Sequence, residues 1–267
     1  HYYIEKIHIL QYNYATMTIY KFSKKQNKIH RRLSSFQVIV ISFLSLIMLG
    51  TLLLMLPLST RNGNGATFQD AIFTSTSAVC VTGLVVRDTA TYWSGFGQAV
   101  ILSLIQIGGM GVVTVALSIT VISGKKIGLM QRSTMQEAIA APKIGGIVRL
   151  TNFILKTTIA LELIGALILF PTFYQKLGFF KGLWYSIFHS ISAFCNAGFD
   201  LNGNFSSLTA YDSNASVNFT VMGLVIAGGI GFITWADIKK NRWHFKKYSM
   251  QSKVILITTL VLIILPT

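Results

Sequence analysis

The sequence predicts an all-α polytopic membrane protein made of repeated helical units. Its 267 residues are 52% hydrophobic and only 12% charged, which is about half the charge of a typical soluble domain. Several apolar runs reach the roughly 20 residues that cross a bilayer core. One polar, glycine-ended stretch occurs twice between these runs, which indicates that the chain repeats a structural unit.

Five apolar runs are the predicted membrane-spanning helices. They are residues 36–58, 96–123, 147–170, 217–236 and 254–265. The first 35 residues lack the apolar core of a signal peptide. They are predicted to form a basic N-terminal tail.

The net charge of +15 is divided unevenly among the loops, which predicts the orientation of the chain. Seven Lys or Arg precede residue 36, four lie within 123–147 and six within 238–253, whereas loops 59–95 and 171–216 hold two each. Basic loops remain in the cytoplasm, so the N terminus and the two basic loops are predicted to be cytoplasmic. This distribution argues against a nucleic-acid partner. Recruitment of a cytosolic protein or anionic lipid by the basic face stays open.

Three of the four prolines follow apolar runs. They occur as LMLPLST at Pro57, ILFPT at Pro171 and IILPT at Pro266. Because the proline ring blocks continuation of a helix, we predict that three outward-running helices end at these residues.

The stretch TSTSAVCVTGLVV, residues 74–86, has a counterpart in HSISAFCNAGFDL, residues 189–201. Residues 69–83 align with 184–198 without a gap. The matched pairs include Ser75 and Ser190, Ser77 and Ser192, Cys80 and Cys195, and Gly83 and Gly198. The spacing from the preceding proline to the glycine is 26 residues in the first copy and 27 in the second. Agreement in both motif and spacing indicates an internal repeat.

A GGxG motif lies in each inward run, at 108–111 and at 228–231. Both motifs lie inside apolar runs rather than between a strand and a helix, which excludes a phosphate-binding loop. Small residues let helices approach closely, so close packing is the preferred interpretation. A flexible point or a wall beside a pore stays open.

The segments 68–79 and 183–194 are too short to span a bilayer, and long runs follow them back to the basic side. Each is predicted to be a re-entrant helix with a loop. Glycine lets such a loop turn its carbonyl oxygens toward an axis, where they replace the hydration shell of a cation, as in potassium channels. The preceding serines are predicted to hold each loop by hydrogen bonds. The predicted ion-binding residues are Val79, Cys80, Val81, Thr82, Gly83, Phe194, Cys195, Asn196, Ala197 and Gly198.

Several acidic residues allow more than one interpretation. Asp88 and Asp200 either concentrate cations at the mouth of the loops or are solvated loop acids. Glu162 lies inside a predicted membrane-spanning run. Three roles stay open for it: a role in transport, pairing with Lys156, or support of a filter loop. Asp237 is predicted to cap a helix or pair with nearby lysines.

Cys80, Cys195 and His189 lack the spacing of a metal site. The two cysteines are instead predicted to be small residues packed behind the loops. A membrane enzyme needs paired acids, or a Ser/His or Cys/His pair, at one depth, and only a poor candidate set around His189 is present. The chain is therefore predicted to be no enzyme and to hold no cofactor.

The chain resembles the Ktr/Trk/HKT superfamily of potassium transporters, with the KtrB-like membrane subunit as the nearest match. The segments that carry the resemblance are DAIFTSTSAVCVTGL, FGQAVILSLIQIGGMGVVT, GKKIGL, HSISAFCNAGF and GGIGF. The resemblance covers about residues 36–267 and leaves the N-terminal tail unexplained. The resemblance implies four M1–P–M2 units, each with an outward helix, a pore helix with a filter loop, and an inward helix. It also implies one filter glycine in each unit, here Gly83 and Gly198.

The resemblance also implies a function and partners. It implies a homodimeric subunit of the cell membrane that takes up K⁺, often with Na⁺ dependence. A cytosolic ring of nucleotide-binding regulatory subunits, of the KtrA or KtrC type, would gate it. Two alternatives stay open: a Trk-type subunit with an NAD-binding partner, and a less selective homologue that translocates both Na⁺ and K⁺.

The same resemblance divides the chain in order. The predicted segments are the basic tail 1–35, the first M1–P–M2 unit 36–123, a cytoplasmic loop 124–146, the second unit 147–237, a basic cytoplasmic loop 238–252 and a third M1 helix 253–267. The remainder of the third unit, the fourth unit, the gating loop and the final basic pore residue are expected beyond Thr267. A third filter glycine is expected about 27 residues after Pro266.

Overall fold

The structure is a computed structural model of the chain and describes residues 34–122, 128–138, 146–242 and 244–265. Within these ranges the chain folds into helices, and an isolated β-bridge joins Thr60 to Trp93. The elements are α2 (Ser35–Leu54), η1 (Pro57–Ser59), α3 (Phe68–Val79), α4 (Gly95–Met110), α5 (Val112–Ile122), α6 (Leu129–Ala138), α7 (Ile147–Leu177), α8 (Phe179–Phe194), η2 (Thr209–Tyr211), α9 (Ala215–Gly229), α10 (Phe232–Asn241), η3 (Phe245–Lys247) and α11 (Met250–Ile264). Nearly all of the predicted N-terminal tail, and Pro266, lie outside the described residues.

Two helices, α2 and α7, are long and apolar enough to cross a bilayer on their own. Two further candidate spans are bent pairs, α4 with α5 at 92° and α9 with α10 at 91°. An all-helical chain with several such apolar elements fits a polytopic membrane protein, because helices satisfy their own backbone hydrogen bonds in lipid.

The two GGxG motifs lie at these bends. Gly111 and Gly231 have φ values of 83° and 81° and separate the two helices of each pair. Each predicted inward helix, over 96–123 and over 217–236, is therefore two helices at a right angle. The prediction of close packing at these motifs is also correct, because Gly108 lies against the backbone of α3.

Side-chain caps fix several helix starts. Ser34 and Gln37 form a reciprocal capping box at α2, with N–O distances of 3.0 and 3.2 Å. The hydroxyl of Thr67 accepts from the backbone N–H of Asp70 at the start of α3 (3.2 Å). These caps satisfy backbone donors that have no partner inside the helix. They begin α2 and α3 within one residue of the predicted starts.

The two described prolines of the predicted set behave differently. The helix α2 ends before Pro57, which opens the turn η1, as predicted. The helix α7 continues through Pro171 to Leu177, so the predicted helix end at Pro171 is wrong. The lost backbone hydrogen bond is offset by packing, because both sides of the proline carry buried residues. This buried cluster consists of Leu169, Phe173, Tyr211 and Val217.

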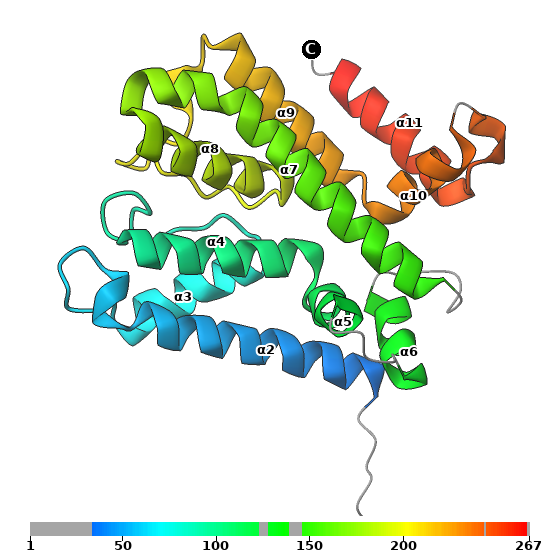
Figure 1. The fold of residues 1–267 in the computed structure, drawn as a ribbon, viewed down its shortest axis with the longest axis horizontal. Coiled ribbons are helices and arrows are strands. Elements are labelled where there is room, and N and C mark those ends of the chain that lie inside the picture. The colour runs from blue at the N-terminus through cyan, green and yellow to red at the C-terminus, as the bar shows by residue number, and fades with distance from the viewer. Residues whose placement is uncertain (1–33, 123–127, 139–145, 243, 266–267) are drawn as a thin grey trace, which may run out of the picture.

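The helices form two neighbouring groups (Figure 1). One contains α2, α3 and α4, and the other contains α7, α8 and α9, while α5 and α6 lie at one end. The groups share a buried cluster that includes Trp93 and Ile101 of the first and Phe188 of the second. The helix α8 begins at Phe179, four residues before its predicted start, because the chain reverses at Gly178 directly after α7.

The predicted cytoplasmic loop 124–146 contains the helix α6. Met135 of α6 is fully buried and packs with Val113, Leu117 and Ile154 of neighbouring helices. The hydroxyl of Thr114 also lies 3.6 Å from the Met135 sulfur. The described part of this loop therefore belongs to the folded core.

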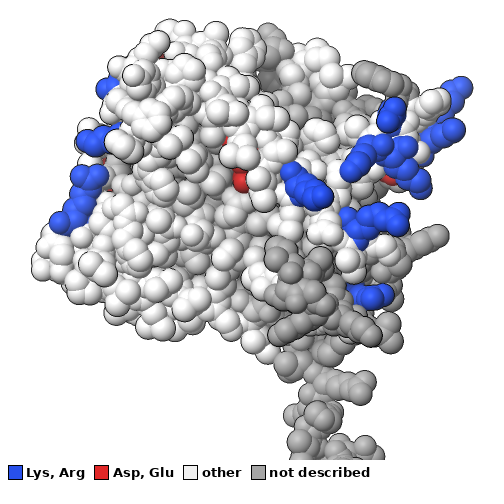
Figure 2. Space-filling model, in the orientation of Figure 1, with Lys and Arg blue, Asp and Glu red and all other residues white. Residues whose placement is uncertain are grey.

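Lys and Arg side chains gather at one end of the molecule, near α10 and η3, and fewer lie at the opposite end (Figure 2). At the more basic end, a carboxylate oxygen of Asp237 accepts from the backbone N–H of Ser249 (3.0 Å) and from the hydroxyl of Ser252 (2.7 Å). Asp237 thereby holds Ser249, whose hydroxyl caps α11, and these contacts favour a capping role over pairing with lysines.

Candidate functional site: the loops after α3 and α8

The helices α3 and α8 each end in a backbone turn of the same type. The N–H of Thr82 donates to the carbonyl of Ser77 (3.0 Å), and the N–H of Val81 donates to that of Ala78 (3.3 Å). This pair of bonds is the Schellman pattern. The second loop repeats it, with Ala197 N to Ser192 O at 2.8 Å and Asn196 N to Ala193 O at 3.0 Å.

The residue after each helix cap is left-handed. Val81 has φ = 56° and Asn196 has φ = 59°. Asparagine tolerates this region, but a β-branched residue such as valine rarely adopts it. Unfavourable backbone conformations are held by their surroundings and occur mainly at functional sites. The first loop therefore maintains a conformation that its sequence alone disfavours.

One serine of each short helix fastens it to the preceding long helix. The hydroxyl of Ser75 donates to the carbonyl of Ile47 in α2 (2.8 Å), and the hydroxyl of Ser190 donates to that of Glu162 in α7 (2.6 Å). Both bonds join residues that are 28 positions apart. The two bonds are equivalent under the repeat.

A second serine holds each loop from inside. The hydroxyl of Ser77 bonds that of Thr82 (2.9 Å), and the hydroxyl of Ser192 donates to the carbonyl of Phe199 (2.6 Å). The prediction that the serines hold the loops by hydrogen bonds is confirmed.

The two loops meet at their glycines. Gly83 and Gly198 have φ values of 73° and 71°. A Cβ atom on Gly83 would lie 2.7 Å from the carbonyl oxygen of Ala197 and 3.4 Å from the Cα of Gly198. The backbone conformation favours glycine at both positions, and the close approach to the carbonyl of Ala197 also requires it at Gly83.

The remaining predicted site residues lie around this contact. Val79 and Phe194 are buried at the helix ends, and each carbonyl oxygen faces a glycine of the following helix, Gly108 or Gly228. Ala197 is fully buried, whereas Thr82 is exposed. The structure thus brings the two predicted sets together at Gly83, Ala197 and Gly198.

The two cysteines differ in their surroundings. Cys195 packs with its sulfur against Gly109 of α4, in agreement with the predicted packing role. Cys80 is exposed, so the same prediction is wrong for this residue. The cause is the absence of an equivalent neighbour for Cys80 in the described part of the chain.

Asp88 joins the segments that follow the two loops. Its carboxylate accepts from the backbone N–H groups of Ala90 (2.9 Å), Thr91 (2.8 Å) and Phe205 (3.0 Å). Burial raises the pKa of Asp88. The hydrogen bonds from Phe205, Thr91 and Ala90 lower it by more, so the pKa lies below its ordinary value. Of the two interpretations, this geometry favours a structural acid.

His189 and Asp200 support the chain after the second loop. The ring nitrogens of His189 contact the carbonyl of Tyr185 (2.7 Å) and the N–H of Leu201 (3.3 Å). Asp200 accepts from the N–H of Asn202 (2.9 Å). The ring of His189 also stacks on that of Phe173, with 5.1 Å between the ring centroids. These contacts give both residues a role in positioning the backbone.

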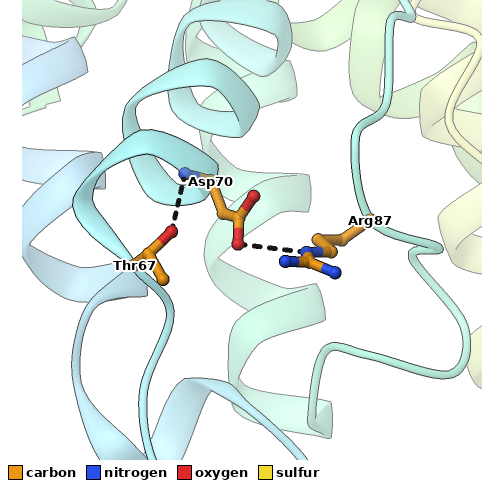
Figure 3. A network of polar contacts seen from close by, with 3 residues as sticks. All are labelled: Thr67, Asp70 and Arg87. Carbon is orange, nitrogen blue, oxygen red and sulfur yellow. Dashed lines mark hydrogen bonds and ion pairs between the residues drawn. The ribbon is translucent and has the colours of Figure 1, made fainter.

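A polar network connects the start of α3 to the segment after the first loop (Figure 3). Asp70, whose N–H is capped by Thr67, forms an ion pair with Arg87 at 3.0 Å. Arg87, which follows the first loop, is therefore tied to the start of α3.

Three residues that position the loops were missed by sequence reasoning. Gly50 and Gly165 make room for the serine bonds, since a Cβ on either would overlap Ser75 or Ser190. Their spacing of 115 residues, the same as that of Gly83 and Gly198, is a signal in the sequence. Gln98, which accepts from the indole N–H of Trp184 (3.0 Å), has no such signal.

The arrangement presents backbone oxygens rather than reactive side chains. Each loop follows the C terminus of a short helix, where the helix dipole carries partial negative charge. No charged side chain lies within 79–83 or 194–198. Such a site suits a cation held by carbonyl groups.

Comparison with known proteins assigns the chain to a family. Residues 6–264 match the TrkH family, described as cation transport protein. The match begins at residue 6, so it includes most of the tail that the resemblance left unexplained. The chain is 42% identical over 248 residues to the potassium/sodium uptake protein NtpJ of Enterococcus hirae, covering 93% of this chain and 53% of that protein.

Two Ktr proteins are also similar. The Ktr system potassium uptake protein B of Bacillus subtilis is 46% identical over 226 residues, which cover 85% of this chain and 50% of that protein. The protein of the same name from Vibrio alginolyticus is 34% identical over 232 residues, which cover 86% and 50%. The chain spans about half the length of these relatives. The chain belongs to the TrkH family of cation transport proteins.

Proposed function

We propose that the chain is part of the ion-translocating membrane subunit of a K⁺ uptake system. The observation that carries this proposal is the approach of Gly83 and Gly198, both at positive φ after a short helix. Rings of backbone carbonyls select K⁺ in channels. The printed names of the Bacillus and Vibrio relatives, both potassium uptake proteins, support the same ion.

The proposed filter consists of residues 79–83 and 194–198. Carbonyl oxygens of these segments replace part of the hydration shell of K⁺, apart from those of Val79 and Phe194, which face Gly108 and Gly228. The C termini of α3 and α8 add partial negative charge. The chain acts by translocation and not by catalysis, with K⁺ as the transported ion and no cofactor.

In this proposal each loop belongs to an M1–P–M2 unit. The first unit contains α2, α3 and the α4–α5 pair, and the second contains α7, α8 and the α9–α10 pair. The equivalent serine bonds to Ile47 and Glu162 support this division. The helix α11 is proposed as the M1 helix of a third unit. Four units around an axis would complete the coordination of the ion.

The proposed setting is the cell membrane, with the N terminus and the more basic end in the cytoplasm. The gathering of Lys and Arg near α10 supports this orientation (Figure 2). We propose a homodimer that binds a cytosolic nucleotide-binding subunit of the KtrA or KtrC type. The Ktr names of the relatives support a multi-component system.

A less selective transporter is a second candidate. The Enterococcus relative is named for both potassium and sodium. A carbonyl filter that admits Na⁺ as well as K⁺ would use the same loops, so the two candidates differ in selectivity and not in site.

Substitution of the glycines tests the filter assignment. Gly83→Ser and Gly198→Ser are introduced into the intact protein, which is expressed in cells that lack other K⁺ uptake systems. Uptake of K⁺ and Na⁺ is then measured separately. Both variants should lose K⁺ uptake or K⁺ preference, because a side chain strains the backbone at either position and at Gly83 also collides with the carbonyl of Ala197.

Gly63→Ser is the matched control, since Gly63 has φ = 72° but open space around it. It carries the same backbone strain outside the site and should leave selectivity unchanged. Unchanged K⁺ uptake and K⁺/Na⁺ preference in both filter variants would contradict the assignment of these loops as the filter. Comparable uptake of Na⁺ and K⁺ by the unaltered protein would favour the second candidate. Capture of the cytosolic subunit and identification of its nucleotide would separate a Ktr-type from a Trk-type partner.

A further inference from the structure

Glu162 lies near the middle of α7 and is 92% buried. A charged side chain at this depth is costly unless another group compensates it. Lys156, the predicted partner, is exposed and lies about 120° away around the helix axis. The interpretation of Glu162 as a partner of Lys156 is therefore disfavoured, and the carboxyl needs another explanation.

Oxygen atoms without a hydrogen-bond partner occur on Glu162 and on two neighbouring side chains. The side chain of Gln106 in α4 is within hydrogen-bonding range of Glu162. Even so, Oε1 of Glu162, Oε1 of Gln106 and Oγ1 of Thr158 are buried without a hydrogen-bond partner among the described residues. Thr158 is fully buried and lies one turn before Glu162 on the same face of α7. Buried polar atoms are nearly always paired, so these three oxygens could accept contacts from a polar or cationic ligand.

The repeat shows that the fold does not need these polar groups. The serine bonds make Ile47 the counterpart of Glu162, and the same offset makes Phe43 the counterpart of Thr158. The glycine motifs likewise make Ile226 the counterpart of Gln106. All three counterparts are apolar, so the packing of these helices is compatible with an apolar junction. The polar cluster is specific to the contact between α4 and α7.

We propose that Glu162, Gln106 and Thr158 form a binding site for one monovalent alkali cation, with Na⁺ as the probe. Carboxylate, amide and hydroxyl oxygens are hard ligands that suit alkali and alkaline-earth ions. One carboxylate balances one positive charge, whereas divalent cations are commonly held by several carboxylates. No group of three His, Cys, Asp or Glu that could hold a metal is found in the described ranges.

The site is separate from the glycines of the loops but lies near the second loop. The carbonyl of Glu162 accepts from the hydroxyl of Ser190 in α8 (2.6 Å), and Cys195 packs against Gly109 of the same helix as Gln106. A bound cation would neutralise the carboxylate beside this loop. The inference does not depend on the proposed filter, because the cluster stands on its own unpaired oxygens.

Thermal unfolding of the purified intact protein tests the site. Na⁺ replaces choline at constant ionic strength, and a ligand that binds the folded state should raise the unfolding temperature saturably. Glu162→Gln keeps the shape of the side chain and removes its charge. This variant should lose the Na⁺-dependent rise, and in choline it should be at least as stable as the unaltered protein, because an uncompensated charge is gone.

Three further variants make the result specific. Thr158→Val should raise the Na⁺ concentration at half-saturation by about tenfold, the effect of one lost polar contact. Glu137→Gln removes an exposed carboxylate of α6 and should keep the full rise. Gly83→Ser should also keep it, which separates this site from the loops. An undiminished rise in Glu162→Gln, its loss in Gly83→Ser alone, or no saturable rise in the unaltered protein would overturn the proposal.

Discussion

Gly83 and Gly198 face each other with their backbones, so that a Cβ on either would lie 3.4 Å from the Cα of the other. The two residues are 115 positions apart in the sequence and occupy equivalent places in two loops. Because this contact involves main-chain atoms alone, the shape of the site depends on how the helices hold the loops. The predictions below test those supports.

The glycines of α4 and α9 should set the position of the loops. A Cβ on Gly108 or Gly228 would overlap the carbonyl oxygen of Val79 or Phe194, which cannot move without its loop. We expect Gly108→Ala and Gly228→Ala to lower the free energy of unfolding by about 1–3 kcal/mol and to reduce K⁺ uptake. Thermal unfolding and uptake assays on the intact protein measure both effects.

Gly223→Ala is the control for this pair, because Gly223 of α9 has open space around it. Alanine exceeds glycine in helix propensity by about 1 kcal/mol, so this variant should be neutral or stabilising. Equal destabilisation by all three substitutions would contradict the proposed docking of the loops.

The serine bonds to the long helices should contribute equally to stability. Ser75→Ala and Ser190→Ala each remove one buried hydrogen bond to a carbonyl, and each should cost about 1 kcal/mol. Ser103→Ala removes an exposed bond within its own helix and should cost little. A large difference between the Ser75 and Ser190 variants, measured by thermal unfolding, would argue against equivalent roles.

Asp88 should link stability to pH. Its pKa is lower in the folded protein than in the unfolded chain, so its contribution is present above the unfolded pKa, about 3.9, and is lost as pH falls through the folded pKa. Asp88→Asn should therefore be less stable than the unaltered protein at neutral pH. The difference between them should shrink below about pH 4.

Unfolding temperatures measured from pH 7 downward check this expectation. Asp212→Asn serves as a control, since Asp212 is exposed and its carboxylate bonds the neighbouring Ser213. A constant gap between the unaltered protein and Asp88→Asn down to the lowest pH would show that the carboxylate charge is not what joins the segments.

The ion pair between Arg87 and Asp70 should contribute little. The side chain of Arg87 is 49% exposed, and exposed pairs contribute at most about 1 kcal/mol. Arg87→Ala should therefore lower the unfolding temperature only slightly. The effect should be larger at low salt, where the ion pair is screened less. Asp70→Asn should cost more, because Asp70 also lies in the first turn of α3, where a negative charge is favourable. Unfolding temperatures of both variants at low and at about 1 M salt check this expectation. A larger loss of stability in Arg87→Ala than in Asp70→Asn would contradict it.

The sequence predicts well what depends on local pattern. The repeat, the two loops, the serine contacts and the start of α3 follow from residue types at fixed spacing. The bends at Gly111 and Gly231 were not distinguished from close packing, because small residues serve both purposes. The structure shows both in the same motif.

Other features depend on neighbours that a linear pattern does not reveal. α7 passes through Pro171 because Leu169 and Phe173 are buried against other elements, which outweighs the local cost. The exposure of Cys80 depends on what lies opposite it. The meeting of Glu162 with Gln106 joins two helices that are far apart in the sequence, so no motif contains both.

The contact between Gly109 and Cys195 is head-to-tail: the first group of helices provides the glycine and the second provides the thiol. Each half of this contact recurs without a described counterpart, since Cys80 is exposed and a Cβ on Gly229 would meet no described atom within 4 Å outside its own helix. A heterologous contact of this kind either closes into a ring or continues without end. We expect ring closure, with a small side chain seated on Gly229 and a glycine opposite Cys80. Under the proposed function, each loop would then be held in place by the unit beside it.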